Sequence, residues 1–173
     1  AGTVTILYSS GSKIVTTGAT EVTQSTAGMP GNPGKGDQMG STMATGDSNG
    51  DGYADLAIYS PGDYYVTIVK GSASGLSYAT AAAFTENSTG IAGSDHATDD
   101  WGLSLRFESF KGAGPQGLAV GADGTSSGKG SVTVLYSTTA GLTGTGSTYL
   151  DQNSPGVPGT AENGDAMGSF FSS

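Results

Sequence analysis

The side chains best suited to chemistry lie in one short stretch, "DSNGDGYAD" at residues 47–55. Oxygen-bearing side chains occupy its first, third, fifth and ninth positions: Asp47, Asn49, Asp51 and Asp55. Hard oxygen ligands at this spacing suit Ca²⁺, which takes about six to eight oxygens. Three aspartates this close together repel one another unless a cation lies among them. We therefore expect a calcium loop, with the backbone carbonyl of Tyr53 as a further ligand.

This stretch, the acidic loop (residues 47–55), fits an EF-hand or a magnesium site less well. An EF-hand needs an acidic residue at its twelfth position and a following helix. The twelfth position here is Ile58, inside the apolar run "LAIYS". Mg²⁺ keeps its waters and demands octahedral geometry, so it suits the loop less than Ca²⁺ does. A metal-free turn is the remaining alternative, and Gly50 and Gly52 allow the tight curl that either state needs.

Catalytic candidates are few. His96 could form a triad with a serine and one of Asp95, Asp99 or Asp100, but no G-x-S-x-G nucleophile motif lies nearby. We interpret His96 as a solvated loop residue. Asp99 and Asp100 could bind a metal, but we expect a capped turn there, because Asp37 and Asp165 lie in matching contexts. The sequence therefore predicts no catalytic site.

An internal repeat organises the chain. "QMGSTMATGDSNGDGYADLAIYS" (38–60) aligns without a gap to "DWGLSLRFESFKGAGPQGLAVGA" (100–122), 62 residues later. "VTIL", "VTIV" and "VTVL" align at Val4, Val66 and Val132. A repeat of this length indicates an array of small units that bury their faces on one another.

Each repeat predicts four strands, here called A to D. "YYVTIVK" (64–70) alternates strictly, with Val66 and Ile68 on one face and Tyr65, Thr67 and Val69 on the other. Short apolar runs such as "ADLAIYS" supply strand B, the Met-Gly and Trp-Gly segments supply strand A, and "ATAAAF" supplies strand D. A four-stranded repeat is the unit of a β-propeller. A β-helix is the alternative, but its coils are usually shorter.

The fold class predicted is therefore all-β, an incomplete β-propeller of about three blades built from four antiparallel strands each. Residues 1–36 would form strands C and D of a split blade, and 37–98 a complete blade with the acidic loop. Residues 99–163 would form a second complete blade, and 164–173 strand A of the split blade. Closed propellers have about four to eight blades. We therefore expect the rest of a parent propeller, or a homo-oligomer, to complete the ring.

With these repeats, the sequence resembles a known family, the FG-GAP repeats of integrin α-subunit heads and their bacterial relatives. Met-Gly and Trp-Gly pairs stand where the family has Phe-Gly, and "YSPG" (59–62) and "GADG" (121–124) stand where it has Gly-Ala-Pro. The linkers look most like those of secreted actinobacterial members. The resemblance implies that the acidic loop is the calcium-binding A–B hairpin loop of a blade.

The second repeat lacks these ligands in its own A–B loop, the degenerate loop (residues 109–117). Ser109, Lys111, Ala113 and Gly117 occupy the four ligand positions, and Lys111 brings a positive charge. The flanking strands nevertheless keep their register. A blade should therefore form without metal, which makes Ca²⁺ a structural brace and argues against a catalytic metal.

The composition of the chain argues against several classes of binding partner. The chain has 15 acidic and 6 basic residues and a formal net charge of −9, which argues against nucleic acid and anionic membranes as partners. It has no cysteine, and no apolar run is long enough to span a membrane. It begins with Ala, so we interpret it as processed or as a piece of a longer secreted bacterial protein.

Two function classes remain after this exclusion. The first is a non-enzymatic extracellular module whose loops bind a protein or glycan, and the resemblance favours it. Tyr78, Phe110 and Tyr149 are the aromatic side chains that could stack on sugars. The second is a propeller domain of, or accessory to, a secreted hydrolase. No cluster of His, Glu, Arg or Lys on the loops supports that alternative.

Overall fold

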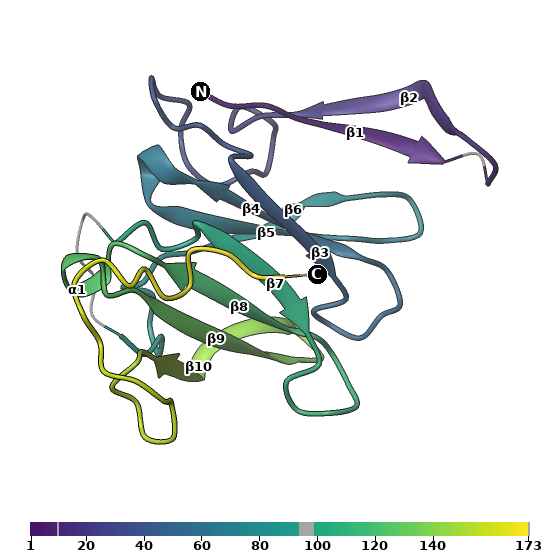
Figure 1. Ribbon diagram of the computed structural model, residues 1–173. Coiled ribbons are helices and arrows are strands. Elements are labelled where there is room, and N and C mark those ends of the chain that lie inside the picture. The colour runs from purple at the N-terminus through teal and green to yellow at the C-terminus, as the bar shows by residue number, and fades with distance from the viewer. Residues whose placement is uncertain (10, 94–98, 173) are drawn as a thin grey trace.

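The computed structural model describes residues 1–9, 11–93 and 99–172. These residues form three antiparallel sheets that follow one another along the stack in chain order (Figure 1). The two-stranded sheet (residues 4–22) is here called the half-blade. The two four-stranded sheets are called the first blade (residues 42–84) and the second blade (residues 104–150). The predicted all-β fold of incomplete propeller blades is confirmed.

The strands are distributed over the three sheets as follows. The half-blade contains β1 (Val4–Ser9) and β2 (Ile14–Val22). The first blade contains β3 (Thr42–Gly46), β4 (Asp55–Ser60), β5 (Tyr65–Lys70) and β6 (Ser77–Phe84), with the short 3₁₀ turn η1 (Pro61–Asp63) after β4. The second blade contains β7 (Ser104–Glu108), β8 (Gly117–Ala122), β9 (Ser131–Thr138) and β10 (Gly141–Leu150), with the single turn α1 (Thr125–Gly128) after β8.

The two blades have the same register. Leu56 of β4 pairs with Val69 of β5, and the matching residues Leu118 and Leu135 pair in β8 and β9. The strand-B runs β4 and β8 are buried along all six residues, because strands lie on both sides of each and a neighbouring sheet or linker covers its faces. The innermost strands β3 and β7 contact each other, which places the two A–B loops at the same end of the molecule.

Apolar side chains fill the spaces between the sheets. Tyr59, Val66, Trp101 and Leu118 belong to the core between the first and second blades. A second core joins the half-blade to the first blade and includes Met39. Trp101 is 4% exposed, so its predicted place in the core is confirmed.

The Met-Gly and Trp-Gly pairs do not lie in strand A as expected. They lie in turns, because β3 begins at Thr42 and β7 at Ser104. Each turn needs two left-handed residues, and Asp100 has φ 51° and Gly102 φ 119°. A Cβ at Gly102 would lie 2.3 Å from the Tyr59 ring. Glycine is therefore required there both by its backbone angle and by the lack of space.

The linkers between sheets repeat as well. The backbone N–H groups of Thr23, Thr85 and Asp151 donate to hydroxyls three residues later, at 3.0, 2.9 and 3.0 Å. The acceptors are Thr26, Ser88 and Ser154. The same hydroxyl turn therefore leads out of all three sheets, at the 62- and 66-residue spacings of the sequence repeat.

The C-terminal segment returns to the second blade. Met167 forms an isolated parallel bridge with Gly130, and residues 164–172 contain no strand. A strand needs a pairing partner, and the described residues offer this segment no strand B. Its carbonyls are held by side chains of β7 instead, at Gly168 by Ser104 and at Ser172 by Arg106. In the described ranges no helix is long and apolar enough to cross a membrane.

Candidate metal centre

The acidic loop joins β3 to β4 and is organised by the Asp47 carboxylate. One oxygen accepts hydrogen bonds from the backbone N–H groups of Gly50 and Asp51, at 2.7 and 3.2 Å. The other accepts the N–H of Gly52 at 2.8 Å. Gly50 and Gly52 have φ of 76° and 87°, conformations that glycine adopts readily. The loop therefore curls around the side chain of its first residue.

These hydrogen bonds also set the ionisation of Asp47. Burial raises the pKa of this carboxyl, but the loop N–H groups, those of Gly52 and Gly50 foremost, outweigh burial and lower it below 3.8. The carboxylate is therefore charged at neutral pH and turned toward the middle of the loop. This is the form that a divalent cation binds.

Asn49 and Asp51 lie on the same curl. The Asn49 amide donates to Asp51 Oδ2 at 2.8 Å, and the other Asp51 oxygen accepts the N–H of Tyr53 at 2.9 Å. Asp51 is exposed, and the side chain of Tyr53 is 44% exposed. The loop thus brings together three of the predicted oxygen ligands, Asp47, Asn49 and Asp51, through direct hydrogen bonds.

Asp55 is placed differently from the other three. Its side chain is fully buried at the start of β4. One oxygen accepts the N–H of Ser48 at 2.9 Å and also the Ser48 hydroxyl, and the other accepts the N–H of Gly71 at 2.8 Å. Asp55 therefore ties the loop to the end of β5. Ser48 and Gly71 were not predicted from the sequence, since neither residue type marks a site.

The donor set fits a hard cation by its chemistry. All four predicted side chains present oxygen, and an ionised carboxylate has about four lone-pair positions. Asp55 and Asp47 each use three of these on protein donors, which leaves one on each. Among the residues described, no three acidic, histidine or cysteine side chains are already gathered as a metal centre. The freer carboxylate of Asp51, the Asn49 amide and backbone oxygens would have to supply most of the ligands.

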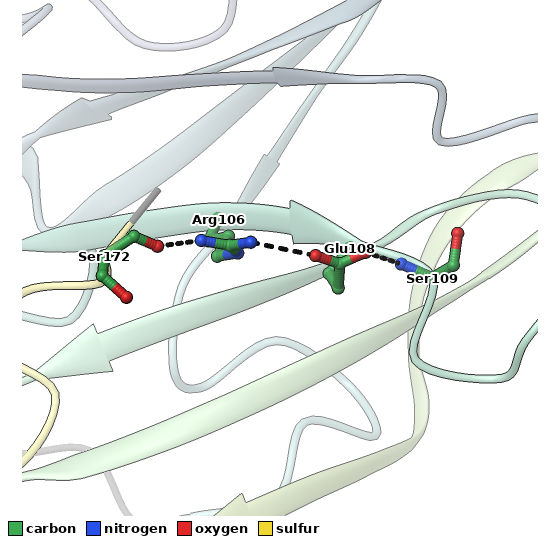
Figure 2. Close-up of polar contacts among 4 residues, drawn as sticks. All are labelled: Arg106, Glu108, Ser109 and Ser172. Carbon is green, nitrogen blue, oxygen red and sulfur yellow. Dashed lines mark hydrogen bonds and ion pairs between the residues drawn. The ribbon is translucent and has the colours of Figure 1, made fainter.

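The start of the degenerate loop is held by side chains of β7. Glu108 accepts the N–H of Ser109 at 3.0 Å and a hydrogen bond from Arg106 at 3.0 Å, while Arg106 also donates to the carbonyl of Ser172 (Figure 2). Lys111 was expected to bring its charge to a ligand position. Its ammonium lies 4.1 Å from the centre of the Tyr136 ring instead, because the loop offers it no carboxylate and an aromatic face attracts a cation.

Among the described residues, the remaining sequence candidates are not gathered into a second metal centre. His96 and Asp95 lie outside the described residues. Asp99 is buried and Asp100 is exposed in the turn before β7. Tyr78 and Tyr149 are half-buried, and burial raises the pKa of Tyr149. Phe110 is 40% exposed and, with Lys111 and Tyr136, lines a pocket of about 100 Å³ beside the degenerate loop.

An apolar groove of about 440 Å³ lies between the half-blade and the first blade, next to the acidic loop. β1 lines one side of it with Ile6 and Tyr8, and Met43 and Leu56 line the other. Tyr53 of the acidic loop also lines the groove. No sequence signal marked this groove, since its residues come from separate repeats.

Comparison with known protein families agrees with this geometry. Residues 39–79 match the FG-GAP repeat family. The matched segment runs from the turn before β3 to the beginning of β6 and contains the whole acidic loop. No match was found among curated proteins. The chain therefore carries an FG-GAP repeat at residues 39–79, in the first blade of an incomplete β-propeller.

Proposed function

We propose that this chain is a non-enzymatic, calcium-binding propeller module of an extracellular protein. The observation that carries the proposal is the gathering of Asp47, Asn49 and Asp51 on one curled turn, around a carboxylate that accepts three backbone N–H groups. When bound, Ca²⁺ would supply the positive charge that offsets the repulsion between these side chains. The loop residues themselves orient the oxygens and fix the hairpin.

The ion would act as a brace rather than as a reagent. The degenerate loop joins β7 to β8 in the same register without any of the four ligands. A blade of this chain therefore forms without metal. Calcium would lock an exposed hairpin in a blade that is already folded, unlike a zinc finger, whose metal drives folding.

The module would present its loops and its groove to a protein or glycan partner. Tyr53 and Phe110 are the exposed aromatic side chains near the two A–B loops, at 44% and 40% exposure. Aromatic side chains at such positions are enriched in binding surfaces. An accessory role beside a hydrolase domain is the alternative, and a glycan array with a pull-down would separate the two.

The open edge of β1 would pair with a further strand. In the described residues β1 pairs only with β2, whereas its counterparts β5 and β9 also pair with β4 and β8. An unpaired edge beside an apolar groove invites association. The rest of a parent propeller, or another copy of the chain, would supply that strand. Light scattering at micromolar concentration tests this, and a stable 17.0 kDa monomer would contradict it.

A calcium titration tests the function itself. Calorimetry on EDTA-stripped protein should give heat with one ion per chain and a rise in melting temperature. Asp51→Ala removes an exposed ligand without touching the buried hydrogen bonds of Asp55, so it should abolish binding while the β-sheet content stays unchanged. The proposal fails if stripped protein gives neither heat nor a melting shift.

A further inference from the structure

We propose that Gln116, a residue of the second blade, positions the acidic loop for calcium, so that metal binding in the first blade is coupled to docking of the second. This inference rests on the proposed calcium site. Gln116 lies at the end of the degenerate loop, immediately before β8. It contacts the main chain of Asp47, the first residue of the acidic loop.

The contact is made in both directions. The N–H of Asp47 donates to Gln116 Oε1 at 2.8 Å, and the N–H of Gln116 donates to the carbonyl of Asp47 at 2.8 Å. Both main-chain groups of Asp47 are therefore held by one residue of the neighbouring blade. The Asp47 side chain is left to bind the N–H groups of its own loop.

Gln116 is itself fixed to the second blade. The Ser137 hydroxyl of β9 donates to the Gln116 carbonyl at 2.6 Å. Pro115 packs against the acidic loop, where a Cβ at Gly50 would lie 3.1 Å from its ring. At Gly46 a Cβ would lie 2.3 Å from the Phe107 side chain. The end of β3 and the start of the acidic loop, from Gly46 to Gly50, thus pack against the second blade.

This arrangement makes Asp47 a shared residue. Its carboxylate shapes the loop that would hold the ion, and its main chain is part of the joint between the blades. Fixing Asp47 before the ion arrives reduces the ordering that binding requires. Coupling of this kind is reciprocal, so an ion that fixes Asp47 also strengthens the joint.

The two hydrogen bonds between Gln116 and Asp47, here called the clamp, have no counterpart at the matching position of the first blade. The residue that matches Gln116 in the first blade is Ala54, which is exposed and has no side-chain acceptor. The degenerate loop lacks the four ligands, but it contains Gln116, which hydrogen-bonds to the acidic loop. We therefore assign the degenerate loop a role in positioning the acidic loop.

Terbium titration, with Tyr53 as the luminescence donor, and calcium calorimetry can test this on the full chain. Gln116→Ala removes the acceptor for Asp47 N–H and should weaken metal affinity about three- to tenfold, as loss of one hydrogen bond predicts. Gln116→Glu keeps an acceptor oxygen and should restore most of that affinity. Lys111→Met, in the same loop but against Tyr136, is the matched control and should bind as the parent does.

A second readout needs no metal. In calcium-free protein, amide exchange at Asp47 should be faster in Gln116→Ala than in the parent, and slow again in Gln116→Glu. If Gln116→Ala does not fold, Ser137→Ala loosens the clamp without touching Asp47 and should weaken binding in the same direction.

The outcomes separate the two proposals. A parent chain that takes up no calcium overturns the proposed function and the coupling with it. A parent that binds calcium while Gln116→Ala binds equally tightly overturns the coupling alone. Equal losses in Gln116→Ala and Gln116→Glu would show that the acceptor oxygen is not what holds the loop.

Discussion

The acidic loop and the degenerate loop have the same length and join equivalent strands of the two blades, yet they are held in different ways. In the acidic loop, the N–H of the first residue, Asp47, is bound by Gln116 of the other blade. In the degenerate loop, the N–H of the first residue, Ser109, is bound by its neighbour Glu108, which also pairs with Arg106. One loop depends on the next blade, whereas the other is closed by its own strand.

The ends of the two loops differ in a matched way. Asp55 has a partner without a side chain, Gly71, whose N–H binds the carboxylate. In the second blade the glycine lies at the other of the two positions. Gly117 matches Asp55, and Ser137 matches Gly71. Ser137 uses its hydroxyl on the carbonyl of Gln116. The loss of ligands in the second repeat is therefore accompanied by a new internal hydrogen bond.

The largest effect should come from Asp55→Ala. This change leaves the N–H groups of Ser48 and Gly71 buried without an acceptor, which should cost about 3 kcal/mol of unfolding free energy or more. Urea denaturation in EDTA measures that cost without any contribution from metal. Asp51→Ala, on the exposed turn, is the control. A loss no greater for Asp55→Ala than for Asp51→Ala would show that the buried hydrogen bonds matter little.

Gly117→Asp should fail to restore a calcium loop in the second blade. A Cβ at Gly117 would lie 2.6 Å from the carbonyl oxygen of Leu135, so the new side chain has no room. Overpacking of this kind should cost about 1–3 kcal/mol. Thermal melting with and without calcium checks it, and a variant that is as stable as the parent would contradict the steric argument.

Lys111→Met should have a smaller effect. It removes the ammonium over the Tyr136 ring, a contact worth about 0.5–1 kcal/mol at an exposed site. Urea denaturation should register the loss in calcium-free and calcium-loaded protein alike. A variant that instead changes calcium affinity would place Lys111 nearer to the acidic loop than the structure does.

The smallest effect concerns Glu108. The N–H of Ser109 first, and then Arg106, hold the pKa of this carboxyl below 4.5. A lowered folded-state pKa means that its stabilisation is present above the ordinary pKa and disappears as the pH falls through the folded value. The difference in melting temperature between the parent and Glu108→Gln should therefore shrink below pH 4.5. A difference that grows on acidification would contradict this assignment.

The sequence predicts the blades well because their signals are local and repeated. Alternation in "YYVTIVK" and the 62-residue alignment specify β5 and the equivalence of β4 and β8. The position of Asp47, Asn49 and Asp51 on one turn also follows from spacing, since the turn is closed by its own side chains. The calcium itself stays a prediction.

Several features depend instead on contacts between units, which spacing does not encode. The buried Asp55 carboxylate accepts the backbone N–H of Gly71 beyond β5, and the clamp on Asp47 requires Gln116 in the next blade. The contact of Lys111 with the Tyr136 ring could not be predicted, because alignment gives a position in the loop but not the direction of a long side chain. The Met-Gly pairs were assigned to strand A, but left-handed residues on either side of Met39 and Trp101 put them in turns.

Anomalous scattering from crystals soaked in calcium or a lanthanide tests the contrast between the two loops most directly. The account predicts one strong peak in the acidic loop, among the oxygens of Asp47, Asn49 and Asp51, and none between Ser109 and Gly117. A peak in the degenerate loop, or an acidic loop that stays empty at saturating metal, would contradict it.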